Sequence, residues 1–318
     1  MNNDRTKIIP SISIIAPVYN EEDSLSKFFA EIIKVISKIT KDWEIICVND
    51  GSDDKSLEIL TEQNTQDDRI KIITFSRNFG KEIALTAGLQ HSSKDVVVPI
   101  DSDLQDPPEL ISQMVEKWQE GFDVVLATRD NRNNDSFIKR TTANLFYKIL
   151  KKVSNIDIPS NTGDYRLMDK KVVETINLCP EKTRFMKGLF AWAGYKTTAI
   201  MFERPERIGG SPKQNYKSLF RLAFDGIFSF STIPLQIWTF IGVIIASISF
   251  FYASLIIIGT IIFGTEVDGY ASTITIILFM GGIQLISLGV LGEYISRIYR
   301  EVKQRPLYVI DKKIGLDK

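Results

Sequence analysis

Two long stretches near the C-terminus carry no charged residue, and they constrain the fold of this chain more than any other feature. Residues 235–263 read LQIWTFIGVIIASISFFYASLIIIGTIIF, and residues 271–292 read ASTITIILFMGGIQLISLGVLG. Each exceeds the roughly 20 apolar residues that a helix needs to cross the core of a bilayer. A buried helix of a soluble protein is the alternative, but two runs of this length favour a pair of transmembrane helices.

The charges around these runs predict their orientation. The connector GTEVDGY, residues 264–270, contains acidic residues and no lysine or arginine. Basic residues flank the two runs on their other sides: Lys213, Lys217, Arg221, Arg297, Arg300, Lys303 and Arg305. Because positively charged flanks stay in the cytosol, we expect both termini there and the connector outside. The N-terminal sequence MNNDRTKIIP has no apolar core of a signal peptide, which agrees with this orientation.

The first part of the chain alternates short apolar runs with helical patterns. Five β-branched runs lie between Ile12 and Arg129, and stretches such as 23–39 and 107–120 have apolar residues three and four positions apart. Nearly continuous apolar strands that alternate with helices predict a parallel α/β sheet. In such sheets ligands bind beyond the carboxyl ends of the strands. The chain places polar residues there, at 19–21, 49–50, 76–78, 101–103 and 128–129.

Composition narrows the chemistry further. The chain has 318 residues, a formal net charge of zero, two cysteines and one histidine. Without a basic excess we expect no nucleic-acid partner, and one histidine excludes a site built from several. The sequence contains no P-loop, no Gly-x-Gly-x-x-Gly and no Gly-x-Ser-x-Gly motif. These absences argue against a P-loop ATPase, a dinucleotide oxidoreductase and a serine hydrolase.

The run PIDSDLQDPPEL, residues 99–110, places several carboxylates directly after a predicted strand. A single residue separates Asp101 from Asp103, so both side chains can reach one divalent cation. Mg²⁺ and Mn²⁺ prefer oxygen ligands, typically one or two carboxylates together with substrate phosphates. Solvated loop acids are the alternative. We interpret Asp106 as the cap of the next helix and Glu109 as an acid of its first turn.

A series of longer motifs resembles glycosyltransferase family 2. They are APVYNEE (16–22), VNDGSDD (48–54), SRNFGKEIALTAGL (76–89), DSDLQDPPE (101–109) and NTGDYRLMD (161–169). The stretches TRFMKGLFAWAGY (183–195) and LISLGVLGEY (285–294) extend the resemblance over nearly the whole chain. It is strongest to the polyprenyl-phosphate glycosyltransferases of the bactoprenol glucosyltransferase branch, and weaker to dolichol-phosphate mannose synthases.

The resemblance implies a GT-A (Rossmann-like) α/β fold and an enzyme that transfers a sugar, with inversion, from a nucleotide diphosphate to a polyprenyl phosphate. UDP-glucose is the first donor implied, undecaprenyl phosphate the acceptor, and Mg²⁺ or Mn²⁺ the cofactor. A donor carrying mannose, GlcNAc or aminoarabinose is one alternative, and a non-catalytic lipid-phosphate-binding membrane subunit is another. The resemblance also suggests a homotetramer. A processive polysaccharide synthase is not favoured, because the chain lacks a Gln-x-x-Arg-Trp motif.

The resemblance also assigns roles to individual residues. The implied nucleotide-binding residues are Pro17, Tyr19, Glu21, Asp50 and Asp101, and the implied metal-binding residues are Asp101, Asp103 and Gln105. Asp164 faces the sugar and the acceptor in the family pattern, and Asp164 and Asp103 are the catalytic candidates. Because a phosphate monoester is mostly dianionic at neutral pH, we expect Asp164 to orient groups or stabilise positive charge rather than remove a proton. Lys81 and Glu82 are further candidates for contact with the sugar or the diphosphate.

Two anionic substrates have to meet, so cations are expected on the acceptor side. The candidates for the acceptor phosphate are Arg129, Arg140, Arg207 and Lys213, with plain surface charge as the alternative. The family often shows Arg-x-x-Gly-x-Ser/Thr-Lys, whereas residues 207–213 read RIGGSPK. Pro212 therefore stands where the family has a hydroxyl residue.

These interpretations combine into one predicted organisation. A cytosolic GT-A domain spans residues 1–212 and includes a basic amphipathic helix at about 137–153, which lies on the membrane or, alternatively, packs on the sheet. A juxtamembrane interface helix follows at 213–232. Two transmembrane helices, at about 235–263 and 271–293, lie within residues 233–297, and residues 298–318 form a cytosolic tail. The expected location is the inner (plasma) membrane, crossed more than once.

Overall fold

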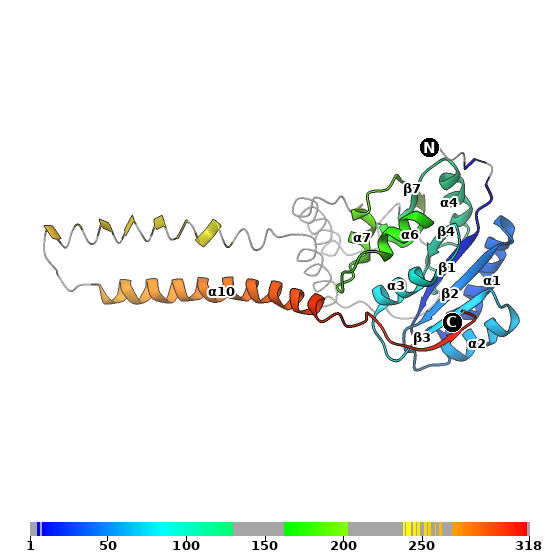
Figure 1. Ribbon diagram of the computed structural model, residues 1–318, viewed down its shortest axis with the longest axis horizontal. Coiled ribbons are helices and arrows are strands. Elements are labelled where there is room, and N and C mark those ends of the chain that lie inside the picture. The colour runs from blue at the N-terminus through cyan, green and yellow to red at the C-terminus, as the bar shows by residue number, and fades with distance from the viewer. Residues whose placement is uncertain are drawn as a thin grey trace. The chain divides into compact units, whose positions relative to one another are not determined.

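The computed structural model describes residues 5–6, 8–129, 162–202 and 269–316, together with scattered positions between 238 and 262. The chain divides into two compact units. One consists of Met1–Ala223 with Pro306–Lys318, and the other of Phe224–Arg305. Figure 1 shows the described elements along the chain.

The first unit is built on one sheet, in which the described strands follow the order β7-β5-β6-β4-β1-β2-β3-β8. The strands are β1 (Ile12–Val18), β2 (Trp43–Asn49), β3 (Ile70–Phe75), β4 (Val96–Pro99), β5 (Val124–Arg129), β6 (Thr162–Asp169), β7 (Thr197–Phe202) and β8 (Ile310–Ile314). The five predicted strands all form, and β1 to β4 pair in parallel as expected. However, β6 runs antiparallel to β4 and β5, and β8 runs antiparallel to β3. The sheet is therefore mixed, which corrects the prediction of a parallel one.

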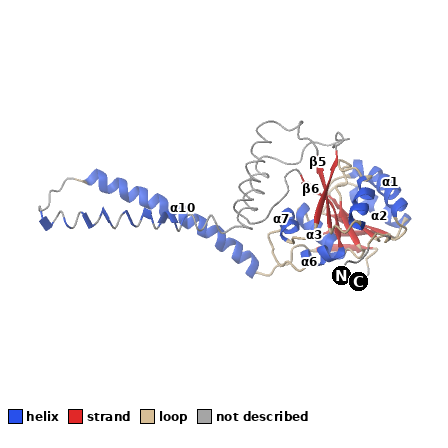
Figure 2. Cartoon of the chain, turned by 90° about the horizontal axis from the view of Figure 1, so that it is seen from above, coloured by secondary structure: helices blue, strands red, loops and turns tan. Residues whose placement is uncertain are grey.

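Helices cover both faces of this sheet. They are α1 (Glu22–Ile39), α2 (Ser56–Gln66), α3 (Lys81–His91), α4 (Leu110–Gln119), α6 (Lys170–Asn177) and α7 (Met186–Trp192). Successive strand residues point to opposite faces. On β2, Ile45 and Cys47 belong to the core shared with α1, α2 and α4, whereas Ile46 and Val48 pack with α3. Figure 2 shows α1 and α2 on one side of the strands and α3, α6 and α7 on the other. Burial on both faces explains why these strands are uninterrupted apolar runs.

Helix α4 begins later than its apolar spacing suggests. Its first residue is Leu110, and Glu109 precedes it without a capping hydrogen bond from its side chain. Pro107 and Pro108 instead form a turn, whose carbonyl oxygens accept from the amides of Leu110 and Ile111 at 3.3 and 3.0 Å. The hydroxyl of Tyr165 on β6 donates to the Pro107 oxygen at 2.8 Å and ties this turn to the sheet. Glu109 therefore lies just before α4 and not in its first turn, which corrects the prediction, whereas the capping role of Asp106 stays a prediction.

The last described residues return to the sheet. Within the predicted tail, residues 310–314 form the edge strand β8. Tyr308 precedes this strand, and its ring stacks on Phe75 of β3 with 4.9 Å between the centroids. Its hydroxyl donates to Gln90 on α3 at 2.6 Å. No strand pattern is evident in the sequence here, because an edge strand with the burial pattern of β8 buries little side-chain surface.

In the second unit, helix α10 (Tyr270–Val302) contains the second predicted span, 271–293. Among the described residues, one helical stretch is long and apolar enough to cross a membrane, Phe279–Val302, and none of its most apolar window is buried. The first predicted span, 235–263, lies mostly outside the described residues, as do the predicted helices at 137–153 and 213–232. The pair of transmembrane helices is therefore not confirmed, and the domain boundaries stay predictions.

Candidate functional site

Asp50 connects the carboxyl end of β2 to the loop before α3. β1 and β2 end side by side, with Val18 opposite Asn49. Directly after β2, the carboxylate of Asp50 accepts from the amides of Phe79 and Gly80 at 2.6 and 2.9 Å. Burial raises the pKa of Asp50, although these two hydrogen bonds and the charge of Arg77 act in the opposite direction. The predicted nucleotide-binding aspartate thus also organises the backbone of this edge.

A second set of hydrogen bonds joins the loops after β1 and β2. The amide of Asn20 donates to the Ser52 hydroxyl at 3.1 Å, and its side-chain oxygen accepts from the amide of Asp53 at 2.9 Å. The amide of Glu21 donates to the Ser56 hydroxyl at 2.9 Å. The side chain of Tyr19 is 37% exposed beside these contacts. The carboxyl end of the sheet therefore presents the Tyr19 ring on two loops that hydrogen bonds hold together.

Asp101 and Asp164 come from different strands and meet at one cation. β4 and β6 pair antiparallel with Val97 opposite Met168, and the same register continued beyond the ladder puts Asp101 opposite Asp164. The ammonium of Lys81, the first residue of α3, lies 2.7 Å from the Asp101 carboxylate and 3.0 Å from Asp164 Oδ2. Asp164 Oδ1 is buried, and none of the residues that the structure describes forms a hydrogen bond with it. Two carboxylates thus converge on a position that already holds a positive charge.

The donor set at this position fits a hard divalent cation. Within the described part of the chain no three acidic, histidine or cysteine side chains gather closely enough to hold a metal by themselves. Mg²⁺ commonly takes only one or two carboxylates, and substrate phosphates and water complete its shell. The carboxylate of Asp101 in this cluster suits a site of that kind. The carboxylate of Asp103, in the same loop, accepts from the amide of Gln105 at 3.1 Å, and Leu104 between them has a positive φ of 56°.

Charged side chains, of which Arg166 is buried, surround Asp164 on the α3 side of the sheet. Burial pushes the pKa of Asp164 up, but the charges of Lys81, Lys187 and Arg166 outweigh burial and hold the pKa below its usual range. Burial, followed by the charge of Asp164, raises the pKa of Glu82 to about 7. The two carboxylates are thus shifted in opposite directions, with the pKa of Asp164 lowered and that of Glu82 raised. Glu82 also accepts from the amide of Met186 at 3.1 Å, which attaches α3 to the start of α7.

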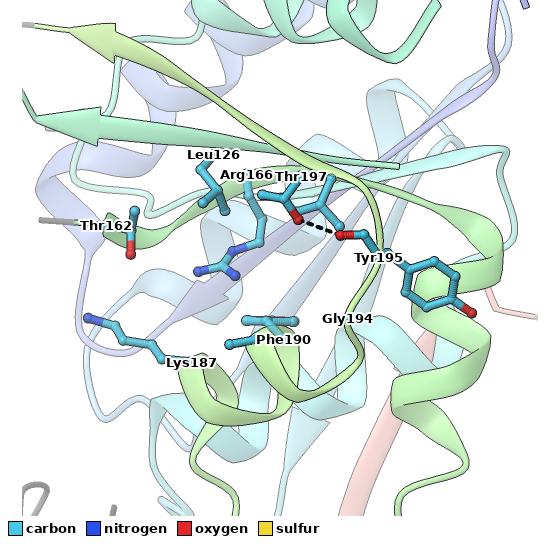
Figure 3. Close-up of a pocket in the computed structure, with 10 residues that line it drawn as sticks. Leu126, Thr162, Arg166, Lys187, Phe190, Gly194, Tyr195 and Thr197 are labelled. Atoms are coloured by element: carbon cyan, nitrogen blue, oxygen red, sulfur yellow. Dashed lines mark hydrogen bonds between the residues drawn. The ribbon is translucent and has the colours of Figure 1, made fainter. Parts of the chain in front are cut away.

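A cavity of about 110 Å³ lies between the sheet and α7, next to this cluster. Its walls include apolar side chains of β5 and α7, and its polar lining is Thr162, Arg166, Lys187, Tyr195 and Thr197 (Figure 3). Thr162, Asp164 and Arg166 alternate along β6 and therefore lie on one face of the strand. The guanidinium of Arg166 packs on the ring of Phe190 at 4.1 Å.

The structure tests the placement of the predicted site residues only in part. Eight of them lie at one edge of the sheet or in the loops beside it: Pro17, Tyr19, Glu21, Asp50, Asp101, Asp103, Gln105 and Asp164. Arg129 is the last residue of β5. Arg140, Arg207 and Lys213 lie outside the described residues. Sequence reasoning missed Arg166 and Lys187. The stretch TGDYRLMD was not identified as a strand, and only a strand places Arg166 on the same face as Asp164.

The chain is similar to proteins of a known family. Residues 13–176 match the family described as glycosyl transferase family 2. The chain belongs to glycosyl transferase family 2. It is accordingly a glycosyltransferase, and the α/β domain with a mixed sheet is the GT-A-like fold that the sequence predicted.

Relatives match over nearly their whole length. An uncharacterized glycosyltransferase of Synechocystis sp. is 53% identical over 306 residues, which is 96% of each chain. The SfII prophage-derived bactoprenol glucosyl transferase of Shigella flexneri is 49% identical over 301 residues, covering 95% of this chain and 97% of the relative.

Among solved structures, the mannosyltransferase of Pyrobaculum calidifontis in complex with GDP-Man and Mn²⁺ is 16% identical. It has a TM-score of 0.48 and covers 70% of this chain and 64% of its own.

Proposed function

We propose that this glycosyltransferase transfers glucose from UDP-glucose to a polyprenyl phosphate, undecaprenyl phosphate, with inversion of the anomeric centre. The observation that carries the proposal is the meeting of Asp101 and Asp164 at the Lys81 ammonium, at the carboxyl end of the central strands. The high identity with a bactoprenol glucosyl transferase along the whole chain supports the acceptor and the sugar. The edge formed by Tyr19 and Asp50 is the proposed nucleotide site.

The proposed cofactor is Mg²⁺ or Mn²⁺, held by Asp101 with Asp103 and Gln105 and by the phosphates of the donor. When bound, a divalent ion stabilises negative charge that develops on the leaving diphosphate. Asp164, held ionised by the surrounding cations, presents Oδ1 with no hydrogen-bond partner among the described residues. We propose that this oxygen contacts the reacting sugar. There it accepts a hydrogen bond from a sugar hydroxyl or faces the positive charge of an oxocarbenium-like transition state. The acceptor phosphate attacks through its own oxygen and needs little help from a base.

The proposed location is a membrane, with the catalytic domain and both termini in the cytosol and the chain assembled as a homotetramer. The apolar stretch in α10 and the lipid acceptor named in a relative support membrane association. A nucleotide sugar other than UDP-glucose would use the same residues for the diphosphate. It would differ only in contacts to the hydroxyl groups of the sugar.

The test is a sugar-transfer assay on purified protein with a panel of nucleotide sugars, Mn²⁺ or Mg²⁺, and a polyprenyl phosphate, with the lipid product followed by mass spectrometry. We expect hexose addition from UDP-glucose and none after chelation of the metal. Asp164→Asn is expected to lose less activity than Asp103→Asn, because Asp164 does not remove a proton. The reverse order would contradict the role given to Asp164, and no lipid product from any donor would refute the function itself.

A further inference from the structure

The cavity beside Asp164 brings two cations to one small space. Arg166 is 4% exposed, and Lys187 lies at the start of α7 and lines the same cavity. In Figure 3 both head groups point toward the space beside Thr162. Like charges that share a partly buried, apolar-walled space repel one another unless an anion joins them.

Some hydrogen-bond donors of these two cations have no acceptor among the residues that the structure describes. Arg166 donates from Nε to the Asp164 carbonyl at 3.2 Å and from Nη2 to the Gly163 carbonyl at 2.8 Å. Within the described residues its Nη1 has no acceptor, and Lys187 has no ion-pair or hydrogen-bond partner. Asp164, the nearest ionised carboxylate, is already paired with Lys81. Among the described residues, the site therefore has donors that no side chain accepts from.

We propose that Arg166 and Lys187 bind a phosphate group in this cavity, and that it is the phosphate of the acceptor lipid. The assignment rests on the proposed function, and it adds to the acceptor residues two that the sequence did not indicate. The volume of about 110 Å³ holds more than a single water, and arginine and lysine are the usual phosphate ligands. Two of the lining residues, Thr162 and Arg166, lie two positions before and after Asp164 on the same face of β6, so the phosphate would lie beside the proposed sugar site.

A purely structural role is the competing explanation. The two backbone hydrogen bonds and the ring contact of Arg166 are what a residue that fixes β6 would make. That role does not involve Lys187, which is partly exposed and makes none of these contacts. Lys187 is therefore the residue to change.

The experiment measures ligand binding by calorimetry on the full chain in detergent, with farnesyl monophosphate as the probe. Lys187→Gln is expected to weaken its binding about 10- to 100-fold, the loss of one charge-assisted hydrogen bond, and to leave UDP binding with Mn²⁺ unchanged. Arg166→Lys keeps the buried charge but loses the Nη1 donor, so we expect a smaller loss. Lys170→Gln, an exposed lysine of α6 outside the cavity, is the matched control and should bind like wild type.

Three outcomes overturn the assignment. The first is equal affinity of wild type and Lys187→Gln for farnesyl monophosphate. The second is a Lys187→Gln variant that loses affinity only for UDP, which would indicate that the cavity binds the donor nucleotide. The third is inorganic phosphate that binds through Lys187 without competing with farnesyl monophosphate. Because the measurement needs no turnover, it is independent of the transfer assay. A wild type that binds the probe through Lys187 but transfers no sugar would refute the proposed function alone.

Discussion

Gly51 offers a sharp test of how the nucleotide edge is built. It follows Asp50 with a positive φ of 67°, and a Cβ placed on it would lie 2.6 Å from the Arg77 carbonyl carbon and 2.8 Å from the Asn78 nitrogen. Both neighbours are backbone atoms, so the contact cannot be relieved by a side-chain rotation. Gly121 also has a positive φ, 92°, but has nothing within 4 Å of its Cβ position. Gly121→Ala therefore measures the cost of the backbone conformation without the clash.

The magnitude follows from the two glycines. The left-handed conformation costs an alanine about 1–2 kcal/mol at either position, partly offset by a stiffer unfolded chain. The clash adds about 1–3 kcal/mol at position 51 alone. At about 2–4 °C per kcal/mol for a unit of this size, Gly51→Ala should unfold about 2–12 °C below Gly121→Ala in a thermal melt. It should also weaken UDP binding, because the displaced backbone leads directly to the amides that Asp50 holds. Equal melting temperatures for the two variants would refute this reasoning.

Three further predictions test the cluster around Lys81 and the C-terminal strand. Lys81→Met removes the cation between Asp101 and Asp164, with which Mn²⁺ would compete for these carboxylates. Mn²⁺ alone should therefore bind about fivefold more tightly in an electron paramagnetic resonance titration, while sugar transfer falls. Weaker Mn²⁺ binding would contradict competition between Lys81 and the metal. The pKa of Glu82 is raised to about 7, so its stabilising effect is complete below its ordinary pKa near 4.5 and is lost as the pH rises through 7. Wild type should therefore lose up to about 3 kcal/mol of stability between pH 4.5 and 8 relative to Glu82→Gln in denaturant titrations, and parallel profiles would count against this. Tyr308→Phe should lower the stability of the sheet domain by about 0.5–1.5 kcal/mol through the hydrogen bond to Gln90, and Tyr308→Ala should cost more through the stack on Phe75; identical losses would show that the hydroxyl alone anchors the segment.

Local patterns of residues were enough to predict the five apolar strands, the helices between them and the end of the sheet where the site lies. These features are local, because a strand buried on both faces must be continuously apolar and because parallel strands end at one edge. The motifs around Asp50, Asp101 and Asp164 likewise sufficed for the family. Periodicity also marked the apolar stretch in α10.

Which of the site residues contact one another depends on the tertiary structure. Asp101 and Asp164 are far apart in the chain, and the antiparallel insertion of β6 beside β4 places both of them at Lys81. Arg166 and Lys187 converge on one cavity because β6 and α7 pack together, and no spacing in the sequence records that contact. The edge strand β8 and the Pro107 turn also depend on partners distant in sequence, Phe75 and Tyr165. Pairing between distant segments is set by the packing of the whole sheet, which a local pattern of residues does not encode.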